Sequence, residues 1–190
     1  EARLCKALGI DLVITDHHEC KPELPEAVAV VNPHRRDSTY PFLHLAGVGV
    51  AFKLAAAVLG DQDRVFAEYC DLVSLGTVAD VMPLLGENRV LVPGGIASIQ
   101  NCRRPGLLAL MQECQLTPAA VNSSAIGYTL APRINAAGRM GQVHLAAELF
   151  LTADPQEAAV LADALCRLNR QRQSIEAEIY ADAVSDGTGR

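Results

Sequence analysis

The chain has 190 residues, of which 50% are apolar and only 4% are aromatic, and it contains no Trp. This length allows one core of fair size, filled mainly by Ala, Val and Leu, or one domain plus part of another. The net charge of -6 argues against an indiscriminate nucleic-acid binder, which usually carries a basic surface. It does not exclude a nuclease, because phosphate contacts can be local.

Six cysteines are spread along the chain and none forms a C-x-x-C pair, so the sequence predicts neither a zinc knuckle nor a thioredoxin-type motif. We interpret them as small buried side chains in a reducing cytoplasm. The longest apolar stretch, residues 45–60, contains Lys53 and is too short to span a bilayer. We therefore expect a cytoplasmic protein without a membrane segment.

The first part of the chain is predicted to form a short helix, a strand, a proline-rich loop and a second strand. The strands are expected at residues 11–16 and 28–33, which are compact β-branched runs typical of a buried parallel sheet. The remainder is predicted to be helical. The expected helices are at residues 45–60, 63–81, 87–101, 104–115, 123–131, 144–151 and 154–184. The fold class is therefore α/β, rich in helix.

Two helix starts carry specific signals. Asp61 or Asp63 is a plausible N-cap for the helix predicted at residues 63–81. Asp154 and Pro155 are typical of an N-cap and first helical position. The long helix that follows is polar on most faces in its second half, so we expect it to connect domains or to pack on another part of the protein.

A stretch reading Thr-Asp-His-His-Glu follows the first predicted strand. Ligands of open α/β sheets bind at the carboxyl ends of strands, and histidines and carboxylates bind Mn²⁺, Zn²⁺ or Mg²⁺. Because adjacent residues leaving a strand point in opposite directions, one of His17 and His18 could bind a metal while the other faces a substrate. The alternative is a polar strand end with no ligand.

Two further segments could carry chemistry. Asp80 is predicted to lie inside an apolar helix end, where a carboxylate needs a partner such as a metal, a helix cap or an arginine. Residues 131–141 are predicted to break from helix at Pro132 and to form a compact turn that presents Arg133, Asn135 and Arg139. Two arginines and an amide suit a phosphate; a solvated loop is the alternative.

Several other functions are not supported. The glycine-rich start of residues 47–52 lacks the last glycine of a dinucleotide fingerprint and follows no clear strand. Its glycines suit close helix packing or a helix N-terminus open to an anion. No G-x-S-x-G motif of a serine hydrolase is present. His44 and His144 stand alone and are expected to be structural or solvated.

Four blocks in order, "VITDHHE", "VVNPHRRDSTYPFLHLAGVGVAFKL", "DLVSLGTVADVMPLLGENRVLV" and "APRINAAGRMG", closely resemble the RecJ family of bacterial single-stranded-DNA-specific exonucleases. That family is part of the DHH phosphoesterase superfamily. The resemblance covers nearly the whole chain. It implies a DHH-type parallel-sheet domain and 5′-to-3′ hydrolysis of single-stranded DNA by a two-metal centre of Mn²⁺ or Mg²⁺, in DNA repair and recombination.

The resemblance also implies roles for individual residues. His17 and Asp80 would bind the same metal ion, Asp16 would orient the site from behind, and His18 would face the scissile phosphate. Arg133, Asn135 and Arg139 match the block that lines the nucleic-acid path. Single-stranded DNA would be the substrate, and a single-strand-binding protein and a helicase would be partners.

Parts of the family pattern are missing. The aspartates of the family's first motifs, which complete the two-metal centre, have no counterpart before Val13, and the glycine-rich downstream domain is absent. We therefore expect residues 1–152 to be the C-terminal part of a catalytic domain and residues 153–190 to be an interdomain linker helix. This piece alone would be inactive, with an incomplete metal site, and could self-associate through uncovered apolar faces.

Two alternatives stay open at this point. One is a DHH phosphodiesterase that acts on short oligonucleotides or cyclic dinucleotides. The other is a binding module derived from this superfamily that has lost its catalytic role. The intact Asp16, His17, His18 and Asp80 count against the second alternative.

Overall fold

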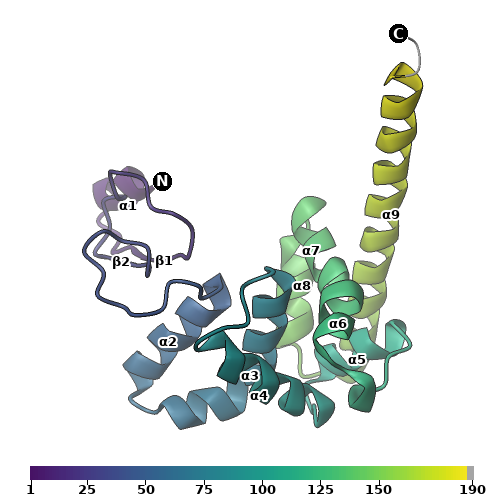
Figure 1. Ribbon diagram of the computed structural model, residues 1–190, viewed down its shortest axis with the longest axis horizontal. Coiled ribbons are helices and arrows are strands. Elements are labelled where there is room, and N and C mark those ends of the chain that lie inside the picture. The colour runs from purple at the N-terminus through teal and green to yellow at the C-terminus, as the bar shows by residue number, and fades with distance from the viewer. Residues whose placement is uncertain (188–190) are drawn as a thin grey trace. The chain divides into compact units, whose positions relative to one another are not determined.

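The computed structural model describes residues 1–187, and the side chains of residues 1–185. It divides into two compact units, Glu1–Ser98 and Ile99–Arg190, each described by itself below. The order of elements along the chain (Figure 1) is α1 (Ala2–Ala7), β1 (Val13–Thr15), β2 (Ala29–Val31), α2 (Gly47–Leu59), α3 (Gln62–Ala79), α4 (Asn88–Gln100), α5 (Pro105–Glu113), a 3₁₀ turn η1 (Pro118–Ala120), α6 (Ser123–Ala125), a π-helical turn η2 (Ile126–Leu130), α7 (Ala131–Arg139), α8 (Val143–Leu151) and α9 (Pro155–Gly187).

The first unit contains a small parallel sheet. Strands β1 and β2 pair in parallel with Ile14 opposite Val30. The ladder extends past both strand ends, where the Asp16 amide donates to the Val31 carbonyl at 3.0 Å and the Val28 amide donates to the Leu12 carbonyl at 2.8 Å. This register places the carboxyl ends of both strands at one edge of the sheet, where Asp16 and its neighbours follow β1. The predicted parallel pairing is confirmed, but the prediction that the strands are buried is wrong, because none of their six residues is buried and Val13 is 52% exposed.

Helices α2 and α3 pack against each other and form the core of the first unit. The rings of Phe52 and Phe66 meet edge to face at 6.3 Å between centroids. Gly76 allows the helices to approach closely, because a Cβ at this position would lie 2.7 Å from a methyl carbon of Val48. The buried residues of this core are Leu45, Val50, Phe52, Ala56, Val65, Val73 and Leu91. The site described below rests on this pair of helices.

The helix ends follow the predicted capping chemistry. Of the two candidate caps for α3, Asp61 is the N-cap, and its carboxylate accepts the Arg64 amide at 2.9 Å. Asp154 precedes α9, and its carboxylate accepts the Gln156 amide at 2.9 Å. Pro155 occupies the first position of α9, where its missing N–H costs no helical hydrogen bond.

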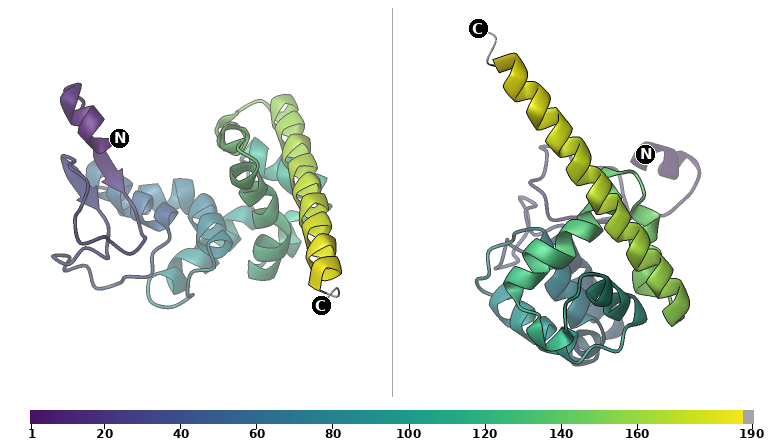
Figure 2. Two further views of the ribbon diagram at one scale, coloured as in Figure 1. Left: turned by 90° about the horizontal axis from the view of Figure 1, so that it is seen from above. Right: turned by 90° about the vertical axis from the view of Figure 1, so that its right-hand side faces the viewer.

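The second unit is helical, and α9 packs against α5, α7 and α8. Figure 2 shows α9 as one continuous helix that extends beyond these three neighbours. Its first half supplies buried residues, whereas Ile179 and Tyr180 in its second half are exposed. The buried side chains of α9 are Ala158, Leu161, Ala162, Leu165, Cys166, Leu168 and Asn169. The predicted long C-terminal helix is confirmed.

The predicted break at Pro132 is wrong. Pro132 is the second residue of α7, but the chain is helical without a gap from Ser123 to Arg139, so the proline lies inside a helical run. The π-helical turn just before it departs from the regular i→i−4 hydrogen-bond pattern, which a proline cannot complete. The π-helical turn η2 leads directly into α7. Arg133, Asn135 and Arg139 therefore lie on a helix and not on a compact turn.

The sequence predicted that the cysteines are small buried side chains and that the chain has no membrane segment. All six cysteines are free thiols, of which Cys70 and Cys166 are buried and the other four partly buried. Among residues 1–187, no helix combines the length and the apolar character needed to cross a membrane.

The close approach of α2 and α3 generates a first prediction. Gly76→Ala forces a Cβ into Val48, whose branched side chain has little freedom to move, and should lower the free energy of unfolding by about 1–3 kcal/mol. Gly138→Ala is the matched control, since a Cβ at this position in α7 meets only Val143 at 3.8 Å and removes a helix-destabilising glycine. Urea denaturation measures both, and equal effects of the two substitutions would contradict the packing argument.

Candidate metal centre

The turn after β1 is built around the carboxylate of Asp16. One carboxylate oxygen, Oδ1, accepts the backbone amide of His17 at 2.7 Å and that of His18 at 3.2 Å. A short polar side chain that accepts amides from the next residues is the usual way to close such a turn. Asp16 thereby ends the strand and fixes the backbone on which both histidines stand.

The same oxygen of Asp16 also accepts a hydrogen bond from the ring of His18. The distance from His18 Nδ1 to Asp16 Oδ1 is 2.7 Å. This hydrogen bond lowers the pKa of Asp16, with help from the two backbone amides, and it raises the pKa of His18. Because Nδ1 is used in this bond, the other ring nitrogen of His18 is the one left to meet a ligand.

His17 meets Asp80, which lies more than sixty positions further along the chain. His17 Nε2 and Asp80 Oδ2 are 3.3 Å apart, and the side chains are 15% and 45% exposed, respectively. Asp80 is the C-cap of α3, so its carboxylate stands at the helix end and is half exposed. The expectation of a carboxylate buried inside an apolar helix end was wrong for this reason, although the expected need for a partner is met by His17.

The two histidine rings lie side by side. Their centroids are 4.3 Å apart and their planes are tilted by 47°. We expected the side chains to point in opposite directions, and this was wrong because β1 ends at Thr15: residues 16–18 form a turn and do not keep the alternation of a strand.

Neighbouring residues that the sequence did not single out hold this turn in place. The Asn32 side chain donates to the His18 carbonyl at 2.9 Å and accepts the His34 amide at 2.8 Å. Gly47, the first residue of α2, lies next to the His17 ring, and a Cβ there would be in ordinary van der Waals contact with His17 Cδ2, at 3.4 Å. The sequence showed Asn32 only as a strand stop before a proline, and Gly47 only as part of a glycine-rich helix start.

The loop after Asp80 is held by Asn88, the first residue of α4. This side chain is fully buried and donates to the carbonyls of His44 at 2.6 Å and Pro83 at 3.0 Å. It therefore ties the segment that follows α3 to the segment that precedes α2. Those are the segments next to Asp80 and to Gly47, so Asn88 indirectly fixes both sides of the His17–Asp80 contact.

The backbone immediately after Asp80 is strained. The Met82 amide donates to the Thr77 carbonyl and the Val81 amide to the Val78 carbonyl, which is the Schellman pattern that ends a helix. This pattern places Val81 in the left-handed region, with a φ of 56°. Glycine normally takes that position, and an L-residue with a side chain pays about 1–2 kcal/mol there.

The donor set fits a hard divalent ion. Two neighbouring ligands of an octahedral ion, each bonded at about 2.1 Å, lie about 3 Å apart, close to the 3.3 Å between His17 Nε2 and Asp80 Oδ2. In the described residues, donor atoms of Asp16, His17 and His18 also lie within 4.8 Å of one another. One imidazole and one carboxylate leave most of a coordination shell to be filled by other groups.

Arg133, Asn135 and Arg139 belong to the second unit and do not share one helix face. Successive residues of a helix turn by about 100°, so Asn135 and Arg139 are neighbours on the surface and both are exposed. Arg133 lies on another face and is partly buried, and it donates to the Thr129 carbonyl at 2.7 Å. The exposed Asn135 and Arg139 therefore differ in environment from the partly buried Arg133, although the sequence placed all three in one candidate phosphate site.

Arg133 also lies next to two cysteines. A hydrogen bond from the Cys114 thiol, together with the Arg133 guanidinium, lowers the pKa of Cys166, and the same thiol–thiol bond raises the pKa of Cys114. Cys114 follows α5 and Cys166 lies in α9. Arg133 of α7 thus lies next to a residue at the end of α5 and a residue of α9. The prediction that Arg133 binds a phosphate did not include this contact with the two cysteines.

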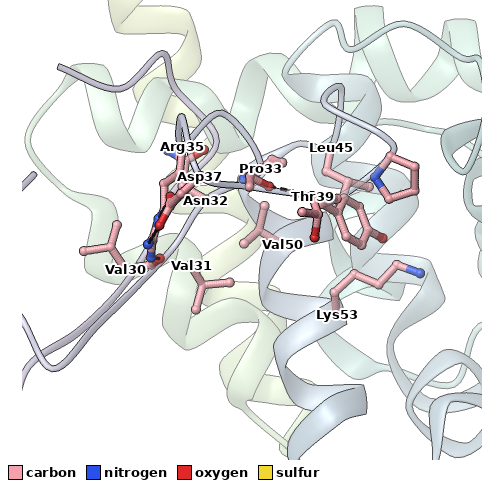
Figure 3. A pocket seen from close by; sticks show the side chains of 13 residues that line it. Val30, Val31, Asn32, Pro33, Arg35, Asp37, Thr39, Leu45, Val50 and Lys53 are labelled. Carbon is pink, nitrogen blue, oxygen red and sulfur yellow. Dashed lines mark hydrogen bonds and ion pairs between the residues drawn. The ribbon is translucent and has the colours of Figure 1, made fainter. Parts of the chain in front are cut away.

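A hollow of about 480 Å³ lies beside the end of β2. Figure 3 shows Lys53 of α2 at one side of it and Arg35 with Asp37 at the other. Both of these cations are already paired: Arg35 with Asp37, through two hydrogen bonds of 2.9 and 2.6 Å, and Lys53 with Glu87. Because Arg35 and Lys53 each pair with a carboxylate, the hollow is less suited to an anion than two unpaired cations at its edge would make it.

The chain is similar in sequence to known proteins. Residues 1–77 match the sequence model of the DHH family, N-terminal domain. The chain is 42% identical over 184 residues to the single-stranded-DNA-specific exonuclease RecJ of Bacillus subtilis, and 41% identical over 192 residues to RecJ of Salmonella typhimurium. Residues 1–77 therefore share the sequence pattern of that family, and the similarity to the RecJ exonucleases extends over nearly the whole chain. The chain spans 23% and 33% of the lengths of these two relatives, respectively, which cover 97% and 94% of it.

Solved structures agree with this similarity in sequence. RecJ of Thermus thermophilus in complex with Mn²⁺ superimposes with a TM-score of 0.80 at 36% identity, over 96% of this chain and 28% of that one. A second exonuclease RecJ bound to manganese gives a TM-score of 0.83 at 35% identity, over 97% of this chain and 47% of that one. The expected resemblance to RecJ and the expected fold are therefore confirmed.

The Asp16–His18 bond generates a prediction about titration. The raised pKa of His18 means that its share of the stability is complete below pH 6.5 and is lost as the pH rises through the raised value. The lowered pKa of Asp16 means that its share is complete above pH 3.8 and is lost as the pH falls through the lowered value. The Asp16–His18 pair therefore stabilises the metal-free protein most between pH 3.8 and pH 6.5.

NMR titration of the histidine rings in metal-free protein tests this. We expect the pKa of His18 to lie above 6.5 and to fall in Asp16→Asn. The fall should be incomplete, because the charge of Asp80 also raises the pKa of His18. A His18 pKa that does not change in Asp16→Asn would show that the hydrogen bond does not form.

Proposed function

We propose that this chain forms part of a metal-dependent exonuclease that hydrolyses phosphodiester bonds of single-stranded DNA in the 5′-to-3′ direction. The observation that carries the proposal is the 3.3 Å contact between His17 and Asp80, in a chain about 40% identical to single-stranded-DNA-specific exonucleases. The relatives named here favour this activity over a phosphodiesterase for short oligonucleotides or cyclic dinucleotides, and over a non-catalytic module.

In this proposal, His17 and Asp80 bind a Mn²⁺ or Mg²⁺ ion together, the ions that the matched RecJ structures contain. Such ions polarise a bound phosphate and activate water. The chain itself supplies the positioning. Asp16 holds the backbone of the turn and the His18 ring, and the second ring nitrogen of His18, whose side chain is 76% exposed, faces the scissile phosphate.

The second unit would contribute to substrate binding. Asn135 and Arg139, which share an exposed face of α7, are proposed to bind the DNA backbone, because a guanidinium pairs well with phosphate oxygens. Arg133 is proposed to bind DNA as well, although its contacts with Thr129 and Cys166 also give it a structural task. Removing Arg133 should therefore reduce both affinity and stability.

The wider setting follows from the same similarity to the RecJ exonucleases. We propose that the protein acts in the cytoplasm in DNA repair and recombination, beside a single-strand-binding protein and a helicase. We also propose that residues 1–152 form part of the catalytic domain and that residues 153–190 form the helix linking it to a further domain. The exposed Ile179 and Tyr180 of α9 support an additional contact for that helix, with another domain or with a second copy of the chain.

The activity is tested in the full-length protein that contains this sequence. With Mn²⁺, 5′-phosphorylated single strands should release mononucleotides, and duplex DNA of the same sequence should not. His17→Ala and Asp80→Asn should each lower kcat/KM by about 100-fold or more, since each removes a metal ligand. His144→Ala, an exposed histidine on α8, is the control. Equal rates on duplex DNA, or full activity of both ligand variants, would refute the proposal.

The 190 residues by themselves should behave differently. Because His17 and Asp80 supply only part of a coordination shell, calorimetry of the isolated chain with Mn²⁺ should show weak binding and no second tight site. The same preparation should not cleave single-stranded DNA. Tight binding of two Mn²⁺ ions, or robust cleavage, would show that the aspartates expected upstream are not needed.

A further inference from the structure

Val81 combines two features that do not normally occur together. Its backbone has a φ of 56°, a conformation in which a β-branched residue is an outlier. Its side chain is 86% exposed, so the described residues offer it almost no packing that would offset the strain. Glycine would fit the same Schellman turn without strain. Local stability therefore gives no reason for a valine at this position.

The chain offers a direct comparison at the end of α5. Gln115 occupies the same place in a second Schellman turn, with the Leu116 amide donating to the Met111 carbonyl and the Gln115 amide to the Gln112 carbonyl. Its φ is 54° and it is also exposed. Among residues 1–187, these two are the only non-glycine residues with a positive φ. Gln115 is polar and unbranched, as is common on a surface, whereas Val81 is apolar and branched.

The position of Val81 relative to the metal centre is fixed by its neighbours. It directly follows Asp80, whose carboxylate contacts His17. On its other side the Met82 amide is bonded back to Thr77, so the turn cannot swing away without breaking the helix cap. An apolar side chain is thus held at the rim of a polar site and directed to the surroundings of the protein.

We infer that Val81 contacts the base of the nucleotide whose phosphate is held at His17 and Asp80. This inference rests on the proposed exonuclease function. A nucleotide bound through its phosphate offers the faces of its base as its largest apolar surface, and contact with that face is independent of sequence because every base has one. The strained backbone is retained because it presents the side chain to the substrate.

The inference is tested in the full-length protein with Val81→Gly and Val81→Ala. Both remove the branched side chain, and the glycine also relieves the backbone strain. For single-stranded DNA we expect KM to rise about three- to tenfold in both variants, with kcat changed less than twofold, as for loss of a contact made equally in the ground state and the transition state. The melting temperature of Val81→Gly should equal or exceed that of the wild type.

A substrate change identifies the group that Val81 touches. On a strand whose 5′-terminal nucleotide is abasic, wild type and both Val81 variants should have the same KM, because the base that makes the contact is missing. Gln115→Gly is the matched control, as it changes the same backbone position of the Schellman turn that ends α5, and it should leave KM unchanged on the normal and on the abasic strand.

Three results would overturn the inference while leaving the exonuclease proposal intact. The first is an unchanged KM in both variants of an active enzyme. The second is a rise in KM that persists on the abasic strand. The third is a melting temperature that falls more in Val81→Gly than in Gln115→Gly, which would mean that Val81 packs against another part of the protein. An inactive wild type would instead refute the proposed function, and the inference with it.

Discussion

The contact between His17 and Asp80 is the constraint on which the candidate site depends. It joins the end of a strand to the end of a helix that is remote in sequence, at 3.3 Å. The start of α2, at Gly47, lies next to the His17 ring, and Gly76 lets α2 pack closely against α3, the helix that ends at Asp80. The position of the candidate metal ligand Asp80 therefore depends on the close packing of α2 and α3.

Much of the fold follows from patterns in the sequence that have a direct physical cause. The β-branched runs form the two parallel strands, and Asp154 with Pro155 starts the long helix as expected. Pro132 misled the prediction because a π-helical turn directly before it lets the helical run continue through the proline. Whether a proline falls at the start or in the middle of a helix depends on packing that the local sequence does not express.

The candidate residues of the site were easier to predict than its geometry. His17, His18 and Asp80 were selected by residue type and by the family resemblance of the sequence blocks that contain them. The side-by-side rings, the half-exposed Asp80 and the support from Asn32 and Asn88 depend on contacts between distant segments. The strain at Val81 was equally hidden, since a valine in an apolar stretch gives no sign that its φ will be positive.

A crystal structure of the full-length protein grown with Mn²⁺, with anomalous data collected to locate the metal, tests the proposed metal centre. We expect a manganese peak between His17 Nε2 and the carboxylate of Asp80, at bonding distance from both, while the Asp16 carboxylate keeps its hydrogen bond to the His18 ring. A manganese ion bound instead by Asp16 and His18, with Asp80 outside the coordination shell, would contradict the proposed metal centre.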